Sequence, residues 1–311
     1  MAASFLRPDA AGLGQEVPRL SELMEMIRRG LKHLSRVNDV LLRRLRIERD
    51  ITIFPDDVFL TSFPRSGNTW TRFLVGNLVH PDEPVTFLNL ERLVPDMYVH
   101  SDREMRTLKR PRVIKSHECF DPRYKKVVYI VRDPRDVAVS NYHWELKKGS
   151  FGDGFPLQEF VPRWMDAFYW PRLGNWAEHV TSWLSTRRDH EGFLLVRYED
   201  LMKNTRHELQ RLARLLSIEP TQERLQRAAE LSSADRMRQL ETSEGGKWLP
   251  TKYTRQDQPF VRKATSGGWR SVLPEKTVTY LEQNWGPLMQ SLGYELATGT
   301  AGRVLTSHAE E

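Results

Sequence analysis

Groups that can bind an anion or move a proton recur in this sequence directly after apolar runs of strand length. Cations and hydroxyls at such positions can hold phosphate or sulfate groups, and an imidazole can act as a general base near neutral pH. A lone strand-end cation is more often solvated than functional, so the repetition carries the signal. The residues are Arg65, Ser66, Gly67, Asn68 and Thr69; Lys115 and His117; Arg132 and Ser140; and Tyr198; two further cations, Arg262 and Lys263, lie in a late loop.

The first of these groups lies in FLTSFPRSGNTW, residues 59–70, where an apolar run breaks into a short polar loop and resumes at Trp70. A strand, a glycine turn and a helix start together direct backbone N–H groups toward an anion. The Walker pattern G-x-x-x-x-G-K-[ST] is absent, because only Gly67 lies in the loop and no lysine precedes Thr69. The stretch therefore predicts a phosphate loop that is not the common NTPase kind.

Four apolar runs rich in Val, Ile, Leu and Phe alternate with stretches of helical character. Near-continuous apolar character is what strands covered on both faces require, and their alternation with helices is typical of a parallel, doubly wound sheet. We therefore predict an α/β fold, a parallel sheet flanked by helices, with the ligand outside the carboxyl ends of the strands. The predicted strands are 58–63, 112–116, 125–131 and 193–201, and the predicted helices are 69–80, 134–146, 175–188, 206–217, 221–240 and 274–292, with a loop over 241–268.

The composition is that of an ordinary globular protein, with 39% hydrophobic and 28% charged residues. No apolar run approaches the length of a membrane span, and the N-terminus lacks the basic and apolar regions of a secretory signal. The single cysteine, Cys119, allows no intrachain disulfide and favours a reducing compartment, so we expect a cytoplasmic protein. The formal net charge of +6 favours anionic partners, which include nucleic acid, a membrane surface and a small polyanion.

Three parts are expected in the chain: an N-terminal arm with a basic amphipathic helix over 1–50, a single domain over 51–295 and a disordered tail over 296–311. Between residues 20 and 50, leucines and an isoleucine recur at helical spacing with arginines interleaved. Such a helix can make peripheral contact with a membrane, although packing against the domain is its commoner fate.

The ordered set of motifs strongly resembles the cytosolic sulfotransferase family. FPRSGNTW is similar to that family's 5′-phosphosulfate loop, usually written YPKSGTTW, and VIKSHECF is similar to its KTH segment. VVYIVRDPRDVAVSNYHW resembles the 3′-phosphate motif, LLVRYEDL the segment that contacts adenosine, and FVRKATSGGWR the late RKGxxGDWK motif. Five motifs in one order are far more specific than any one of them, and the likeness covers roughly residues 55–292.

This resemblance implies a P-loop-like nucleotide-binding fold and an enzyme that moves a sulfonate from 3′-phosphoadenosine 5′-phosphosulfate (PAPS) to a hydroxyl or amine of a small acceptor, leaving adenosine 3′,5′-bisphosphate (PAP). It implies His117 as the general base, with Lys115 and Arg65 as cations beside the transferring group. No metal is required, because these side chains supply the cation that Mg²⁺ provides in NTPases. The donor-binding residues implied are Arg65, Ser66, Gly67, Asn68, Thr69, Trp70, Arg132, Ser140, Tyr198, Ser232, Arg262, Lys263 and Ala264.

The sequence departs from the family pattern at several positions. Arg65 stands where the cytosolic members usually carry Lys, which replaces a point cation by a planar fork. Ala264 and Gly268 replace the Gly and Asp of RKGxxGDWK, so the late loop is expected to bind or close differently. The family's dimer motif, K-x-x-x-T-V-x-x-x-E, is not in register after Trp269, which leaves the oligomeric state open.

The acceptor site is expected from two aromatic-rich stretches, residues 81–110 and 144–172. Their rings suit a phenol, a steroid or another apolar alcohol, but they are equally suited to a hydrophobic core. The rings concerned belong to Tyr98, Trp144, Phe151, Phe155, Phe168, Tyr169 and Trp170.

Two other functions stay open beside sulfonate transfer. A P-loop kinase or NTPase predicts Mg²⁺-dependent ATP turnover, and the missing Walker lysine speaks against it. A non-catalytic nucleotide-binding relative, or a basic nucleic-acid binder, is the second alternative. The presence of Lys115 and His117 favours an enzyme, and no known nucleic-acid motif is found in the sequence. We therefore expect a small-molecule acceptor and no nucleic-acid partner.

Overall fold

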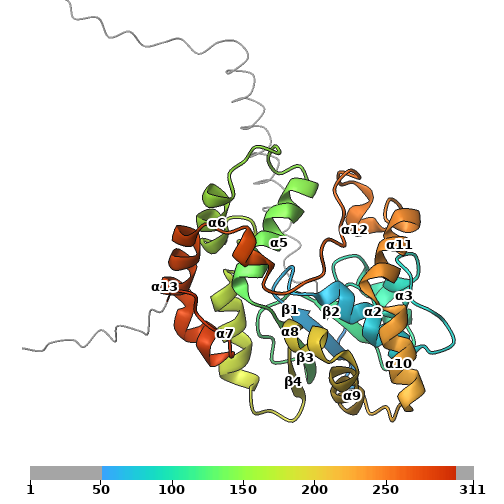
Figure 1. Cartoon of the computed structure of the whole chain (residues 1–311). Helices are drawn as coiled ribbons and strands as arrows, with labels where there is room; N and C mark the ends of the chain where they lie inside the picture. The colour runs from blue at the N-terminus through green and yellow to red at the C-terminus, as the bar shows by residue number, and fades with distance from the viewer. Residues whose placement is uncertain (1–50, 299–311) are drawn as a thin grey trace, which may run out of the picture. The chain divides into compact units, whose positions relative to one another are not determined.

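The computed structural model describes residues 51–298, which form a parallel four-stranded sheet in the order β2-β1-β3-β4 (Figure 1). The predicted α/β fold is therefore confirmed. The predicted N-terminal arm and helix over 1–50, and residues 299–311 of the tail predicted over 296–311, lie outside the described residues. The strands are β1 Val58–Ser62, β2 Val113–Ser116, β3 Lys126–Val131 and β4 Phe193–Arg197.

The described helices follow the predicted pattern closely at most of their ends. Each of the predicted helices over 69–80, 134–146, 175–188, 206–217 and 274–292 is found within two residues of its expected ends. The helices are α2 Asn68–Val79, α3 Leu90–Leu93, α4 Asp102–Thr107, α5 Pro134–Lys147, α6 Leu157–Met165, α7 Trp176–Arg187, α8 Tyr198–Lys203, α9 Thr205–Leu215, α10 Gln222–Leu231, α11 Ala234–Glu244, α12 Leu249–Lys252 and α13 Glu275–Ser291, with a 3-10 turn, η1, at Gly268–Ser271.

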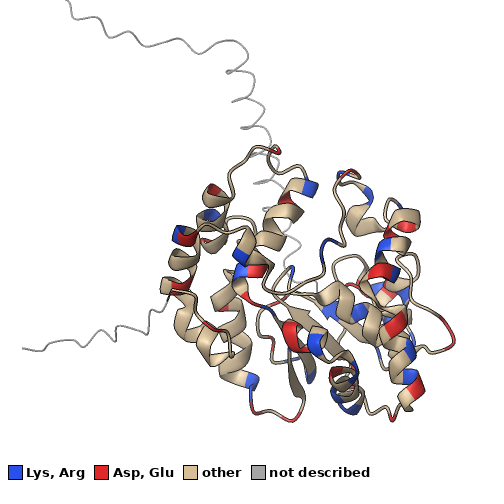
Figure 2. Ribbon diagram, in the orientation of Figure 1, with Lys and Arg blue, Asp and Glu red and all other residues tan. Residues whose placement is uncertain are grey.

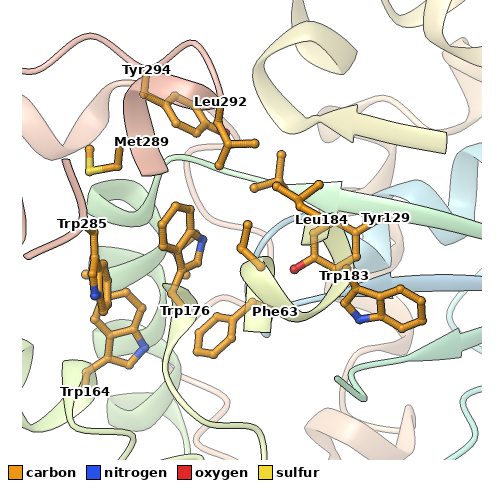
Figure 3. Packing of buried hydrophobic residues seen from close by; sticks show 14 of the residues in the cluster. Phe63, Tyr129, Trp164, Trp176, Trp183, Leu184, Trp285, Met289, Leu292 and Tyr294 are labelled. Atoms are coloured by element: carbon orange, nitrogen blue, oxygen red, sulfur yellow. The ribbon is translucent and has the colours of Figure 1, made fainter. Parts of the chain in front are cut away.

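Alternate residues of the same strands are buried on opposite faces of the sheet, as the two-residue period of a strand requires. Phe59 and Tyr129 belong to a cluster with residues of α5, α6, α7 and α13, whereas Leu60 and Val128 belong to a cluster with α2, α9 and α10. These two groups of helices flank the sheet on either side. Figure 3 shows the first cluster, where the indole of Trp285 contacts those of Trp164 and Trp176.

Two predicted elements differ from the structure. The strand predicted over 193–201 ends at Arg197, and Tyr198 begins α8, where Glu199 and Asp200 lie in the first turn and favour a helix start. The helix predicted over 221–240 is interrupted at Ser232, because Ser233 accepts a hydrogen bond from the Arg236 amide and starts a new helix. The predicted loop over 241–268 consequently begins later and contains α12.

Charged residues of both signs are spread along the outer helices, as α6, α10 and α11 show (Figure 2). Such a mixed surface is ordinary for a protein in water. Within residues 51–298, no helix combines the length and the apolar character that crossing a membrane requires.

The carboxyl ends of all four strands lie at one edge of the sheet, because every strand pair is parallel. From β1 the chain moves to β2 on one side and then to β3 on the other, so the strand order reverses around β1. In open α/β sheets a ligand binds outside the carboxyl ends at such a reversal. The ends of β1, β2 and β3 are therefore where the functional groups are expected to meet.

Candidate active site

The loop between β1 and α2, residues 63–67, contains two left-handed backbone conformations. Arg65 has φ 71° and Gly67 has φ 100°. A Cβ at Gly67 would lie 2.5 Å from a ring carbon of Tyr198, so glycine is needed here for space as well as for conformation. The first turn of α2 contains no acidic residue, and its cap residue makes no side-chain hydrogen bond to it. Its amides are therefore available to an anion.

The Ser66 hydroxyl oxygen and the Arg132 Nε are among the buried polar atoms at this edge that have no hydrogen-bond partner within the described residues. Leaving a buried polar group without a partner costs about 1–3 kcal/mol. A hydroxyl and a guanidinium N–H both donate hydrogen bonds, and phosphate or sulfate oxygens accept them. The donor set thus fits a bound anion.

Arg65 is held by groups that are far apart in the sequence. Its Nε donates to the Ser140 hydroxyl at 3.2 Å, and its guanidinium lies 5.2 Å from the ring centre of Trp144 and 4.7 Å from that of Phe260. Burial lowers the pKa of Arg65 to about 10, with the positive charge of Arg132 as the next cause. The two rings orient the planar guanidinium in a way that a lysine would not use.

Arg132 at the end of β3 brings a second cation to the same place. Its side chain donates to the Arg65 carbonyl at 3.4 Å and to the Thr265 carbonyl at 3.0 Å, and its guanidinium lies 4.3 Å from the ring centre of Tyr198. Burial, followed by the charge of Arg132, lowers the pKa of Arg262 to about 10. The three arginines therefore repel one another, and an anion between them would relieve that repulsion.

The late loop, residues 253–267, has little regular structure, and charged side chains from two helices bind its backbone. Lys147 and Asp136 come from α5, whereas Arg238 and Glu241 come from α11. Ala264 adopts φ 51° at the position where the family pattern has glycine. The bonds run from Lys147 to the carbonyls of Arg255 and Gln258, from Arg238 to those of Arg262 and Lys263, from the amides of Phe260 and Val261 to Glu241, and from those of Gly267 and Trp269 to Asp136.

On the α2 side of the site, the Trp70 indole N–H donates to the Ser232 carbonyl at 2.9 Å, and its ring meets that of Tyr198 edge to face at 5.6 Å. The Ser232 hydroxyl is within 3.0 Å of the Asn77 amide nitrogen, which donates to it. Two aromatic rings and a fixed connection between α10 and α11 are thus brought together beside the β1 loop. Such rings can contact a purine through a free face or edge.

The side chain of His117, just past the end of β2, has a defined tautomer. Its Nδ1 lies 2.7 Å from the Ser62 carbonyl, which can only accept, so Nδ1 carries the hydrogen and Nε2 is left as an acceptor. Burial, followed by the charge of Lys115, holds the pKa of His117 well below its usual range. The imidazole is therefore neutral near pH 7 and able to accept a proton.

Lys115 forms an ion pair with Asp96, in which Nζ and Oδ2 are 2.7 Å apart. Its ammonium also lies 5.1 Å from the ring centre of Tyr98. The Tyr98 hydroxyl accepts a hydrogen bond from the His117 amide at 2.9 Å and donates to a Glu118 carboxylate oxygen at 2.9 Å. Lys115 and His117 are consequently connected through one tyrosine.

Some predicted site residues are placed differently from what the motifs suggest. The Asn68 amide nitrogen donates back to the Leu60 carbonyl at 3.0 Å, and its Oδ1 is among the unpartnered buried atoms of the described part. Lys263 is exposed, and Thr69 is partly buried at the start of α2. Between residues 51 and 298, three or more His, Cys, Asp or Glu side chains are nowhere grouped so as to hold a metal ion.

Three residues near the site were missed as positioning groups by sequence reasoning. Asp96 lies in a stretch without periodicity, and Tyr98 was considered only for the acceptor. His179 on α7 is buried and bonds to the His117 carbonyl through Nε2 at 3.0 Å and to the Tyr129 hydroxyl through Nδ1 at 2.8 Å. Each acts across a long sequence distance, so no local motif signals it.

Comparison with known proteins supplies the family. The model of the sulfotransferase domain matches residues 55–293. The chain belongs to this family. It is 29% identical over 240 residues to 3-beta-hydroxysteroid sulfotransferase of Cavia porcellus (73% of this chain, 81% of the relative). It is 26% identical over 233 residues to sulfotransferase 1B1 of Canis lupus familiaris (70% and 78%).

Solved structures of other proteins agree on the fold. Retinol dehydratase in complex with androsterone and PAP superimposes with a TM-score of 0.63 at 21% identity, covering 78% of this sulfotransferase and 83% of that chain. Mouse sulfotransferase SULT7A1 in complex with PAP gives 0.63 at 20% identity, covering 78% and 86%. These structures confirm the predicted sulfotransferase fold. The family model and the sulfotransferase relatives confirm the predicted enzyme class, PAPS-dependent sulfonate transfer, and the NTPase alternative is not favoured.

Proposed function

We propose that the carboxyl edge of the sheet binds PAPS with its two anionic ends on opposite sides of the β1 loop. The 5′-phosphosulfate is held by Arg65, the amides of residues 66–69 and the start of α2. Arg132, Ser140, Arg262 and Lys263 hold the 3′-phosphate, and Trp70, Tyr198 and Ser232 contact the base. One observation carries the proposal: unpartnered buried donors, Ser66 Oγ and Arg132 Nε, lie among mutually repelling arginines.

In the reaction, PAPS supplies an electrophilic sulfonate and the PAP leaving group. His117 accepts the proton of the acceptor hydroxyl at Nε2, because its Nδ1 is occupied by the Ser62 carbonyl. Lys115 places positive charge on the β2 side, and Arg65 places it on the β1 side, where both can oppose negative charge that develops on peripheral oxygens. The proposed transfer requires no movement of Arg65, Lys115 or His117 away from the ends of β1 and β2.

The acceptor is proposed to be a small apolar or aromatic alcohol. The guinea pig relative is named for a hydroxysteroid, and a structural neighbour was solved with androsterone. In this chain, the partly buried rings of Phe151, Phe155 and Tyr169 pack against the core, and Phe151 also contacts Tyr142 of α5. Trp144 is less suited to the acceptor, because it faces Arg65.

The proposal is tested by incubating the full chain with PAPS and a mixed library of phenols, steroids, apolar alcohols and amines, with products identified by mass. The expected result is a gain of one sulfonate on an alcohol or phenol, together with PAP. Turnover is expected to persist in excess EDTA, since no metal is needed to neutralise the sulfonate. Nucleotide hydrolysis that EDTA abolishes, without sulfonated product, would contradict the assignment.

We also propose a cellular compartment and a membrane contact for this protein. The single cysteine, Cys119, favours a reducing compartment such as the cytoplasm. The basic stretch over residues 20–50 is proposed to make peripheral membrane contact, which sedimentation of the full chain with anionic lipid vesicles would test. Loss of that sedimentation in a chain starting at residue 51 would assign the contact to this stretch.

A further inference from the structure

A segment next to the catalytic groups, residues 94–98, runs beside the end of β2 without being part of a regular strand. Asp96 forms an isolated parallel bridge with Lys115. The Lys115 amide donates to the Pro95 carbonyl at 2.8 Å, and the Met97 amide donates to the Lys115 carbonyl at 3.2 Å. The backbone therefore fixes Asp96 and Lys115 as neighbours across one bridge between segment 94–98 and β2, and their side chains meet.

The Asp96 carboxylate uses both oxygens in this arrangement. Oδ2 accepts from the Lys115 ammonium at 2.7 Å, and Oδ1 accepts from the Tyr98 amide at 2.9 Å. Asp96 is only 5% exposed, so its charge requires these partners. The Asp96 amide is held in turn by Glu91, which also binds Arg72 of α2. The carboxylate therefore has a fixed place relative to the helix that begins at the donor loop.

Tyr98 occupies the position between the two catalytic groups. Its ring lies 5.1 Å from the Lys115 ammonium and is nearly parallel to the His117 ring, with centres 6.2 Å apart and planes 14° apart. Its hydroxyl accepts from the His117 amide and donates to Glu118. One side chain thus contacts the cation, the base and the backbone that carries the base.

We propose that Asp96 and Tyr98 are positioning residues for sulfonate transfer, which hold the Lys115 ammonium and the His117 imidazole in one mutual arrangement. The inference rests on the proposed roles of those two groups. A lysine has a flexible four-carbon stem, so its ammonium stays in place only where a partner fixes it. Transfer of a group in line is sensitive to such placement, since a displacement of about 1 Å can cost about 100-fold in rate.

The Asp96 charge has a second, measurable effect on the base. Among the described residues that face His117, Lys115 and His179 lower the pKa of the imidazole, whereas Asp96 raises it. Tyr98 and Glu118 complete the titratable groups around it. Removing the Asp96 charge should therefore lower the pKa of His117 further. Because the base works in its neutral form, the acid limb of the kcat profile should move to lower pH.

The first experiment compares Asp96→Asn with Asp189→Asn, a change of an exposed carboxylate in the turn that precedes β4. In Asp96→Asn we expect kcat to fall about 10- to 100-fold, with the acid limb of its profile at lower pH. PAP affinity by calorimetry should stay within about twofold, because PAP lacks the sulfonate that Lys115 serves. Asp96→Glu, which keeps the charge, should restore the acid limb. Asp189→Asn should behave as wild type.

The second experiment needs no donor and so separates this inference from the proposed function. Tyr98→Phe keeps the ring but removes the acceptor of the His117 amide, and Tyr280→Phe on α13 is the matched control. Hydrogen exchange of the His117 amide, followed by NMR, should be at least about tenfold faster in Tyr98→Phe and unchanged in Tyr280→Phe, as expected for a lost hydrogen bond.

Two results would overturn the inference. One is an unchanged exchange rate of the His117 amide in a folded Tyr98→Phe variant. The other is an Asp96→Asn variant that retains wild-type kcat and an unmoved acid limb, or that loses activity only through weaker PAP binding. If the wild-type chain transfers no sulfonate while the amide exchange behaves as expected, the proposed function fails and the positioning contacts stand.

Discussion

The ends of the adjacent strands β1 and β2 differ in what surrounds their positively charged side chains. At the donor edge, which we define as loop 63–67 with Arg132 and Arg262, the cations lie next to one another. Arg65 and Arg132 donate to a hydroxyl and to carbonyls, and their guanidinium groups lie over aromatic rings. At the catalytic edge, defined as Lys115 and His117 with their contacts, the cation is paired with a buried carboxylate.

This difference is consistent with the roles proposed for the two edges. A donor edge crowded with cations gains most when a polyanion arrives, because the anion relieves the repulsion that, after burial, lowers the pKa values of Arg65 and Arg262. A catalytic edge must keep a cation and a neutral base within reach of one another before any anion is bound. Its charges are therefore balanced within the protein, and binding and catalysis should respond to different substitutions.

The largest expected effect is at the catalytic edge. His117→Ala removes the base, so the transfer rate should fall about 10²- to 10⁴-fold, while PAP affinity by calorimetry stays within about threefold. His190→Ala, an exposed histidine in the turn before β4, is the control. If His117→Ala keeps the wild-type transfer rate, His117 is not the base. If the variant also binds PAP much more weakly, the donor edge and the catalytic edge are not functionally separate.

A second prediction concerns stability and pH behind the catalytic edge. Burial lowers the pKa of His179 to about 4 in the folded chain. The unfolded chain therefore binds this proton first as pH falls, and between about pH 6.5 and 4 the fold loses up to about 3 kcal/mol of stability through this group. Urea unfolding across that range should show a shallower pH dependence in His179→Gln than in wild type. An equal slope in both chains would contradict it.

At the donor edge, Arg132→Ala should weaken PAP binding about 10- to 100-fold, the effect of losing a charged hydrogen-bond donor. Adenosine 5′-monophosphate, which lacks the 3′-phosphate, should lose far less. Calorimetry with both nucleotides measures the difference, and Arg206→Ala on the exposed side of α9 is the control. Equal losses for both nucleotides would place Arg132 away from the 3′-phosphate.

The smallest effect is expected from a change that keeps the charge. Arg65→Lys retains the cation but loses its fit between Trp144 and Phe260, so kcat/KM for PAPS should drop about fivefold. Arg188→Lys, at an exposed position after α7, is the comparison. A rise in kcat/KM would show that the two rings hold the guanidinium unproductively and would revise the picture of the donor edge.

The donor edge was predictable because its signals are local. The runs ending at Ser62, Ser116 and Val131 are apolar, and parallel strands bring their carboxyl ends to one edge whatever the loops between them do. Each of its signals spans only about ten residues: one is a glycine loop followed by a helix, and another is an Arg followed by an Asp-Pro helix start. The motifs that resemble the family are these same local units.

The contacts of the catalytic edge were not predictable in the same way. Asp96 meets Lys115 through a single bridge from a stretch without periodicity, and His179 reaches the His117 carbonyl from a helix on the sheet face. Such pairings depend on tertiary packing rather than on spacing along the chain. The break between α10 and α11 at Ser232 was missed because serines are also found within helices, and only the cap bond to Ser233 decides it.

The late loop has a consequence for how this chain can vary. The loop is held by hydrogen bonds with Lys147, Asp136, Arg238 and Glu241. These bonds go to backbone carbonyls and amides of the loop and not to its side chains. Side chains inside the loop, such as that of Ala264, can thus be replaced while the backbone of the loop keeps its course. The position of Arg262 therefore depends on four helix residues whose side chains bind the loop backbone, and replacing one of them would move Arg262 although its own side chain is unchanged.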